Sequence, residues 1–128
     1  LDTQATDTGY RLGRLFAVLE KAQQDAHSGS LNTTIRDRFF GAASATPRSI
    51  FPRLLSLAQH HLSKLRKENE GYAIAADKRL QEVLDGIGDI PAHLNMQQQA
   101  RFALGYYHQR NALYRKKEDR QPEQQEQA

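Results

Sequence analysis

The apolar residues of this chain recur at helical spacing. Leu12, Leu15, Phe16 and Leu19 occupy positions i, i+3, i+4 and i+7, which is the pattern of one helix face. The chain has 31 Leu and Ala residues but only 7 Val and Ile residues, and the first pair favours helices whereas β-branched residues suit strands. The sequence therefore predicts an all-α fold, and its 128 residues suit one compact bundle of about five helices.

Capping and helix-breaking residues divide the chain into segments. A cap is expected within Asn32, Thr33 and Thr34, and Asn95 with Gln98 resembles a capping box. The predicted helices are 8–26, which stops within residues 27–30, then 35–43, 46 or 49 to 67 or 68, 72–87 and 95–117. Residues 118–128 are rich in Gln and Glu and lack apolar positions. We expect a helical bundle domain over 1–117 and a disordered polar tail over 118–128.

Pro52 leaves two starting points open for the third helix. If Ser49 is the N-cap, Pro52 falls in the first turn, where no amide hydrogen bond is lost. If Thr46 is the N-cap, Pro52 lies inside the helix and a kink is expected.

Positive charge is concentrated in two segments. Residues 35–67 carry seven basic side chains and one acidic, and residues 101–117 carry five basic and none acidic, against a net charge of +3 for the chain. At about 100° per residue, the third predicted helix has one stripe without an acid, formed by Arg53, His60, Lys64 and Lys67. A solvated charged face is one reading, but the missing acids favour an anionic partner.

The last predicted helix has two apolar faces, although a surface helix needs only one. Ala100, Ala103, Leu104, Tyr107 and Tyr114 form the first, and the second is formed by Phe102, Tyr106 and Leu113. The second face belongs either to a central helix packed on two sides or to a surface that docks another subunit. Arg101, His108 and Arg115 recur every seven residues beside these faces.

The sequence contains no recognisable catalytic motif. There is no Gly-rich phosphate loop, nucleophile elbow or Cys, and the adjacent His60 and His61 diverge on a helix and do not chelate readily. We therefore expect a non-enzymatic protein without cofactor or metal. No apolar run approaches a membrane span and no signal peptide is seen, so a cytoplasmic protein is expected.

Three stretches together resemble one known family. Residues 10–20 (YRLGRLFAVLE), 34–47 (TIRDRFFGAASATP) and 102–110 (FALGYYHQR) look like the C-terminal region of the large subunit of Cascade, the type I-C CRISPR surveillance complex. In that family the same region is also made as a separate small subunit by internal translation. That origin fits a chain that begins with Leu1.

The resemblance implies a helical subunit in antiviral defence that stabilises the R-loop and its displaced DNA strand. Implied partners are the Cascade backbone subunits, the large subunit, a second copy of the chain, and the complex of guide RNA with target DNA, especially single-stranded DNA. Recognition of the protospacer-adjacent motif is not implied, because the N-terminal part of the large subunit is missing.

The basic residues fit this role, because phosphate contacts that hold a displaced strand can tip the nearly balanced opening of an R-loop. The candidate nucleic-acid-binding residues are Arg36, Arg38, Arg48, Arg53, Lys64, Lys67, Arg101, Arg110 and Arg115. The candidate protein-interface residues are Phe102, Tyr106 and Leu113. Some arginines could instead pair with acids on neighbouring helices. The alternatives are a structural adaptor between protein subunits and the C-terminal domain of the large subunit itself.

Overall fold

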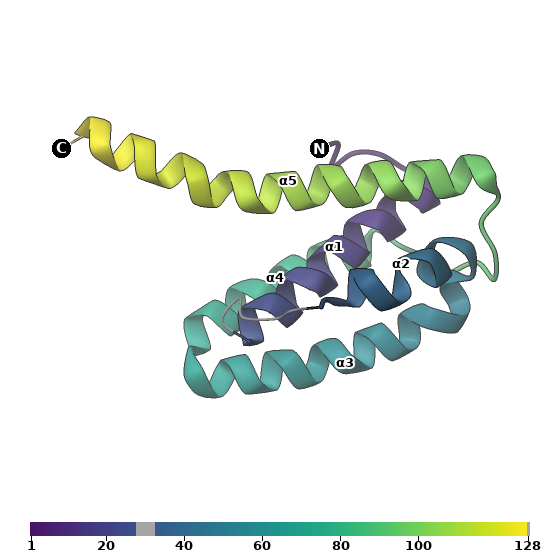
Figure 1. Ribbon diagram of the computed structural model, residues 1–128, viewed down its shortest axis with the longest axis horizontal. Coiled ribbons are helices and arrows are strands. Elements are labelled where there is room, and N and C mark those ends of the chain that lie inside the picture. Colours follow the sequence, from purple (N-terminus) through teal and green to yellow (C-terminus); the bar gives the residue numbers. More distant parts are fainter. Residues whose placement is uncertain (28–32, 128) are drawn as a thin grey trace.

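The computed structural model describes the backbone of residues 1–27 and 33–127 and the side chains of residues 1–27 and 33–115. This part of the chain forms five α-helices and no strand, which confirms the predicted all-α fold (Figure 1). The helices are α1 (Thr8–Ala26), α2 (Ile35–Ala45), α3 (Pro47–Glu68), α4 (Glu70–Asp85) and α5 (Met96–Gln127).

Side-chain caps set most helix starts. Thr34 is the N-cap of α2, where its hydroxyl accepts from the Arg36 amide and Asp37 completes a capping box. At the start of α5, the Asn95 amide donates to Gln98 Oε1 and the Gln98 amide donates to Asn95 Oδ1, both at 2.8 Å. The predicted capping box is therefore confirmed. Asn32 and residues 28–30 of the predicted stop lie outside the described residues.

The structure decides between the two starts predicted for the third helix and shifts the start of the fourth. Thr46 is the N-cap residue of α3, so Ser49 is not, and Pro52 lies inside the helix. Because proline has no amide hydrogen, the Arg48 carbonyl loses its usual partner there. The fourth helix begins at Glu70 rather than at residue 72, since the Asn69 side chain accepts from the Tyr72 amide and caps the helix earlier.

The last helix is longer than predicted. It runs to Gln127 and not to about residue 117, so the expectation that it ends there is wrong. Glu, Gln and Arg all have good intrinsic helix propensity, and the loss of apolar positions alone does not end a helix. The division into a domain over 1–117 and a tail over 118–128 stays a prediction.

The first helix is the centre of the bundle. It contacts the other four helices, and α3 and α5 lie on opposite sides of it. The backbones of α3 and α5 do not come close, but the Phe51 and Phe102 rings meet edge to face at a centroid distance of 6.4 Å. Figure 1 shows α5 crossing one side of α1, with α3 along the other edge. The Phe16 ring of α1 makes edge-to-face contacts with Phe40, Phe51, Phe102 and Tyr106 at centroid distances of 5.6 to 6.5 Å. One aromatic cluster thus joins α1, α2, α3 and α5.

The contact between α1 and α5 depends on glycine. A Cβ atom on Gly13 would overlap the carbonyl oxygen of Phe102, and one on Gly105 would overlap the carbonyl oxygen of Tyr10. The two helix backbones therefore approach more closely than any other residue at these positions would allow. This approach decides which face of α5 is buried.

The buried face of α5 is the second apolar face, for which the sequence left a central helix packed on two sides or a docking surface open. Phe102 and Tyr106 are fully buried and Leu113 is 9% exposed, all within the chain's own core. Their assignment to a protein interface is wrong, because the core of the same chain already covers them. Leu104 and Tyr107, from the other apolar face, are 47% and 41% exposed. Surface available on α5 for another subunit lies on that side.

Candidate nucleic-acid interface

Arginine side chains lie against aromatic rings where α2 meets α3 and α5. We call Arg36, Arg38, Phe39, Arg53 and Tyr107 the basic–aromatic surface. Arg36, Arg38, Arg53 and Tyr107 are exposed, and Phe39 is half-buried. The short helix α2 contacts both α3 and α5, and so it brings these residues together from three helices.

Arg36 joins α2 to α5. Its guanidinium carbon lies 5.5 to 5.7 Å from the ring centroids of Phe40, Tyr106 and Tyr107. Its Nη2 also donates a hydrogen bond to the Tyr107 hydroxyl. The guanidinium plane is thus held in place by rings while its remaining N–H groups stay at the surface.

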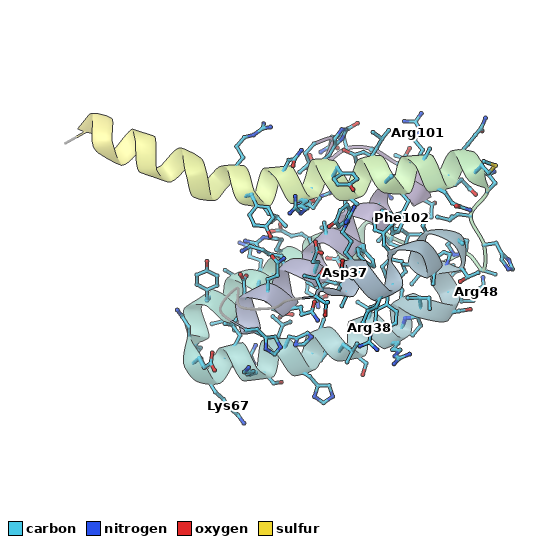
Figure 2. All side chains as sticks on the ribbon, in the orientation of Figure 1. Asp37, Arg38, Arg48, Lys67, Arg101 and Phe102 are labelled. Carbon is cyan, nitrogen blue, oxygen red and sulfur yellow. The ribbon has the colours of Figure 1, made fainter. Side chains whose placement is uncertain are left out.

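Phe39 is shared by two arginines. The guanidinium carbon of Arg53 on α3 lies 5.3 Å from the Phe39 ring centroid, and that of Arg38 lies 5.9 Å from it. Arg38 points from α2 toward α3 in Figure 2. Two cations beside one ring form a platform on which a base can stack while its phosphates meet the guanidinium groups.

Asp37, the acidic residue between Arg36 and Arg38, already has a structural role. Asp37 Oδ2 accepts from the Thr34 amide at 2.8 Å as part of the α2 capping box. Among the described side chains, the ion pair within 4.0 Å is Lys21 with Asp25, and none of the nine candidate basic residues forms one. The arginines of α2 do not pair with acids of neighbouring described helices, and their charge is available to an external anion.

The buried carboxylate of Glu20 stabilises residues that lie behind the basic–aromatic surface. Glu20 is 4% exposed, and its two oxygens accept from Tyr106 Oη at 2.6 Å and from Thr34 Oγ1 at 2.7 Å. Burial raises the pKa of Tyr106, and the hydrogen bond to Glu20 adds to this effect. Glu20 therefore links the N-cap of α2 to the ring that lies behind Arg36.

The nine candidate residues do not form one surface. Arg38 and Arg53 share the Phe39 ring and Arg36 lies on the same helix, whereas the guanidinium carbon of Arg110 lies 4.9 Å from the Tyr114 ring centroid. Figure 2 shows Arg101 on the side of α5 away from α1 and Lys67 at the opposite edge of the molecule. Since Arg101 and Lys67 lie at opposite edges, the basic helical stripes of α5 and α3 do not form one continuous surface (Figure 2).

The remaining candidates have other surroundings. Arg48 Nε donates to the Ile90 carbonyl at 2.9 Å, which fixes the start of α3 to the segment before α5. Lys64 contacts His27. Arg115 is exposed on α5, next to Tyr114, whose hydroxyl donates to Gln24 Oε1 of α1. Arg48 therefore has a structural role that its place in a basic segment did not indicate.

Sequence reasoning missed three contributors to this site. Phe39 follows Arg36 by three residues, which places both on adjacent parts of one helix face, so the sequence held that signal. Tyr107 was placed on the first apolar face of the last helix and was not named as a binding residue. Glu20 gave no signal, because a single acid in an amphipathic helix is normally exposed.

Comparison with known protein families shows to which family this chain belongs. The family described as CRISPR-associated protein (Cas_Csd1) matches residues 1–114. The chain belongs to this family. A search of curated proteins gives no match. Family membership supports a role in CRISPR defence and suggests that the chain takes part in a complex of Cas proteins.

None of the helices in the described part of the chain has the length and apolar character that crossing a membrane requires. No group of three or more His, Asp or Glu side chains among the described residues is arranged to hold a metal ion.

Proposed function

We propose that this chain is a non-catalytic small subunit of a type I-C CRISPR RNA-guided surveillance complex, Cascade, that holds nucleic acid and stabilises the displaced strand of the R-loop. The basic–aromatic surface carries the proposal. It combines three arginines without acidic partners among the described residues with two accessible rings. Charge attracts the phosphates and the rings accept unpaired bases, which suits a single strand more than a duplex.

The energetics of R-loop opening make such a surface sufficient. The heteroduplex that forms is about as stable as the DNA duplex that it replaces, so modest contacts with the displaced strand shift the balance. Phosphate contacts act without regard to sequence and need no catalytic group. The role therefore requires a rigid arrangement of cations, which the packing of α2 against α1, α3 and α5 supports.

The direct test compares R-loop opening by the guide-RNA complex prepared with and without this chain across a salt series. We expect less opening without the chain, a larger deficit at higher salt, and recovery when the chain is added back. Equal opening by the two preparations would contradict the proposal. The double variant Lys64→Glu/Lys67→Glu tests the edge of α3 separately and should weaken DNA retention without loss of helical content.

An adaptor between protein subunits is the second candidate. Met96 is 86% exposed and Leu104 is 47% exposed, so α5 presents apolar surface near its start. The variant Met96→Gln/Leu104→Gln should release the chain from the complex if this surface docks a subunit, while the free chain still binds single-stranded DNA. Full retention of the variant in the complex would remove the adaptor candidate.

A further inference from the structure

A groove lies between α4 and α5, with residues of α1 at its base. Both helices pack on α1, but their backbones do not come close to each other in the part of the chain that the structure describes. The groove holds a cavity of about 340 Å³, which Thr3 of the segment before α1 also lines. This volume is at the lower end of the range of ligand pockets in proteins. The fold therefore offers a defined site away from the basic–aromatic surface.

Three cationic side chains line this groove. Arg14 comes from α1, and Lys78 and Arg79 come from α4. Glu82 lines the groove as well, but among the described side chains none of these four residues forms an ion pair within 4.0 Å. The lining therefore has an excess of positive charge, and an anion that enters the groove meets cations without an ion-pair partner.

Arg14 is held in place by a hydrogen bond to Gln109 of α5. The Arg14 Nε atom donates to Gln109 Oε1 at 2.9 Å, and the Gln109 side chain is buried. This bond leaves the N–H groups of Nη1 and Nη2 for another acceptor. Burial lowers the pKa of Arg14; Tyr10 and Asp2 oppose this effect and Arg11 adds to it. Because burial disfavours the charged guanidinium, a bound anion would stabilise it.

The rest of the lining favours a peptide carboxylate over a nucleotide. No aromatic ring lines the described part of the groove, so a base has no ring to stack on there. Ala75, Val83 and Ala112 instead provide aliphatic surface beside the cations. A planar carboxylate matches the paired N–H groups of a guanidinium, and an aliphatic side chain next to it can cover the alanine and valine side chains.

We propose that this groove binds an acidic segment of a partner protein, in which a carboxylate side chain adjoins an aliphatic one. Arg14 holds the carboxylate through Nη1 and Nη2, and Lys78 and Arg79 attract it from α4. The inference goes beyond the proposed function, because the groove shares no residue with the basic–aromatic surface and requires no nucleic acid. A partner protein can thus dock between α4 and α5 while the basic–aromatic surface holds a strand.

A short synthetic peptide tests the recognition chemistry. The probe is the capped peptide Gly-Asp-Leu-Glu-Gly, titrated into the full chain at constant low salt and followed by NMR. We expect saturable shifts that include the Arg14 Nε–Hε signal. The peptide with Asn and Gln in place of Asp and Glu should bind about tenfold more weakly, because it loses charge-assisted hydrogen bonds. The peptide with Gly in place of Leu should bind about fivefold more weakly, since it leaves the aliphatic surface uncovered.

Matched variants assign the binding to the groove. Arg14→Gln and, independently, Lys78→Gln/Arg79→Gln should each weaken binding of the acidic peptide about tenfold. Arg66→Gln/Lys67→Gln is the control, because it removes the same charge as the α4 double variant from exposed positions of α3 and should keep most of the binding. Circular dichroism identifies any variant that fails to fold. If Arg14→Gln does not fold, the α4 double variant provides the answer.

The other outcomes separate this inference from the proposed function. No binding of the acidic peptide, equal binding of the acidic and amide peptides, or equal weakening by the α3 and α4 double variants would overturn the inference and leave the proposed function intact. If Lys78→Gln/Arg79→Gln loses binding of a single-stranded oligodeoxythymidine and keeps that of the peptide, the groove holds nucleic acid and the inference is wrong. An original chain that binds the peptide but not the oligonucleotide would support the inference and contradict the proposed function.

Discussion

The two faces of α5 differ in what their apolar residues do. The face toward α1 buries Phe102 and Tyr106 completely and includes Gly105, which allows the two backbones to come close together. The opposite face leaves Leu104 and Tyr107 exposed, and Tyr107 contacts Arg36 at the surface. Similar side chains therefore stabilise the fold on one side and support a candidate binding surface on the other. The difference lies in how closely the neighbouring backbone approaches.

The largest expected effect separates the two faces by stability. Phe102→Ala should lower the free energy of unfolding by about 4 kcal/mol, because it leaves a cavity in the aromatic cluster around Phe16. Leu104→Ala, on the other face, should cost less than about 1 kcal/mol. Urea denaturation of the two variants measures both values. Equal losses would show that both faces are packed in solution.

A methyl group added to Gly105 tests the close approach itself. Gly105→Ala should destabilise the fold by about 3 kcal/mol, since the added carbon meets the Tyr10 carbonyl and the helices must move apart. Gly41→Ala is the matched control, because nothing lies within 4 Å of a Cβ at this exposed helical position. The control should gain about 0.5 to 1 kcal/mol. If both substitutions stabilise the chain, the proposed packing of α1 on α5 is wrong.

Tyr106 and Tyr107 allow the buried and exposed faces of α5 to be compared at the level of single hydroxyl groups. Tyr106→Phe should cost about 1 to 3 kcal/mol, because the buried Glu20 carboxylate loses a donor. Tyr107→Phe, whose hydroxyl lies at the surface, should cost less than about 0.5 kcal/mol. Thermal unfolding of the two variants gives the difference. A larger loss for Tyr107→Phe would reverse the assignment of the two rings.

The same pair predicts an alkaline pH dependence. The pKa of Tyr106 is raised in the folded chain, so above about pH 10 the unfolded chain loses this proton first. Stability from Tyr106 is therefore complete below that pH and decreases as the pH rises. Unfolding measured at pH 9 and pH 11 should show a smaller decrease for Tyr106→Phe than for the original chain. An unchanged decrease would exclude Tyr106 as its source.

The sequence predicted those features that local chemistry determines. Thr34 and the pair Asn95 and Gln98 cap their helices as their spacing indicates, and Phe51, Leu54 and Leu62 are buried on one side of α3. Each of these follows from interactions within one helix or from its periodicity. Fold class and most helix boundaries are accessible at this level.

Arrangement between helices could not be read from periodicity. Both apolar faces of α5 have helical spacing, and only the approach of α1 at Gly13 and Gly105 decides which one is buried. The glycines are the signal that could have indicated it, because glycine inside a helix is costly unless a backbone lies close by. The basic stripes of α3 and α5 were likewise visible, but their separation by α1 was not.

Salt-dependent binding of single-stranded DNA tests the basic–aromatic surface most directly. For Arg36→Gln/Arg53→Gln, we predict weaker binding and a slope of log K against log salt that is about 1.4 smaller than for the original chain, which is the loss of two phosphate contacts. Lys78→Gln/Arg79→Gln removes the same charge from α4 and should keep most of the slope. Equal slopes for the two double variants would contradict the account, because net charge alone would then explain binding.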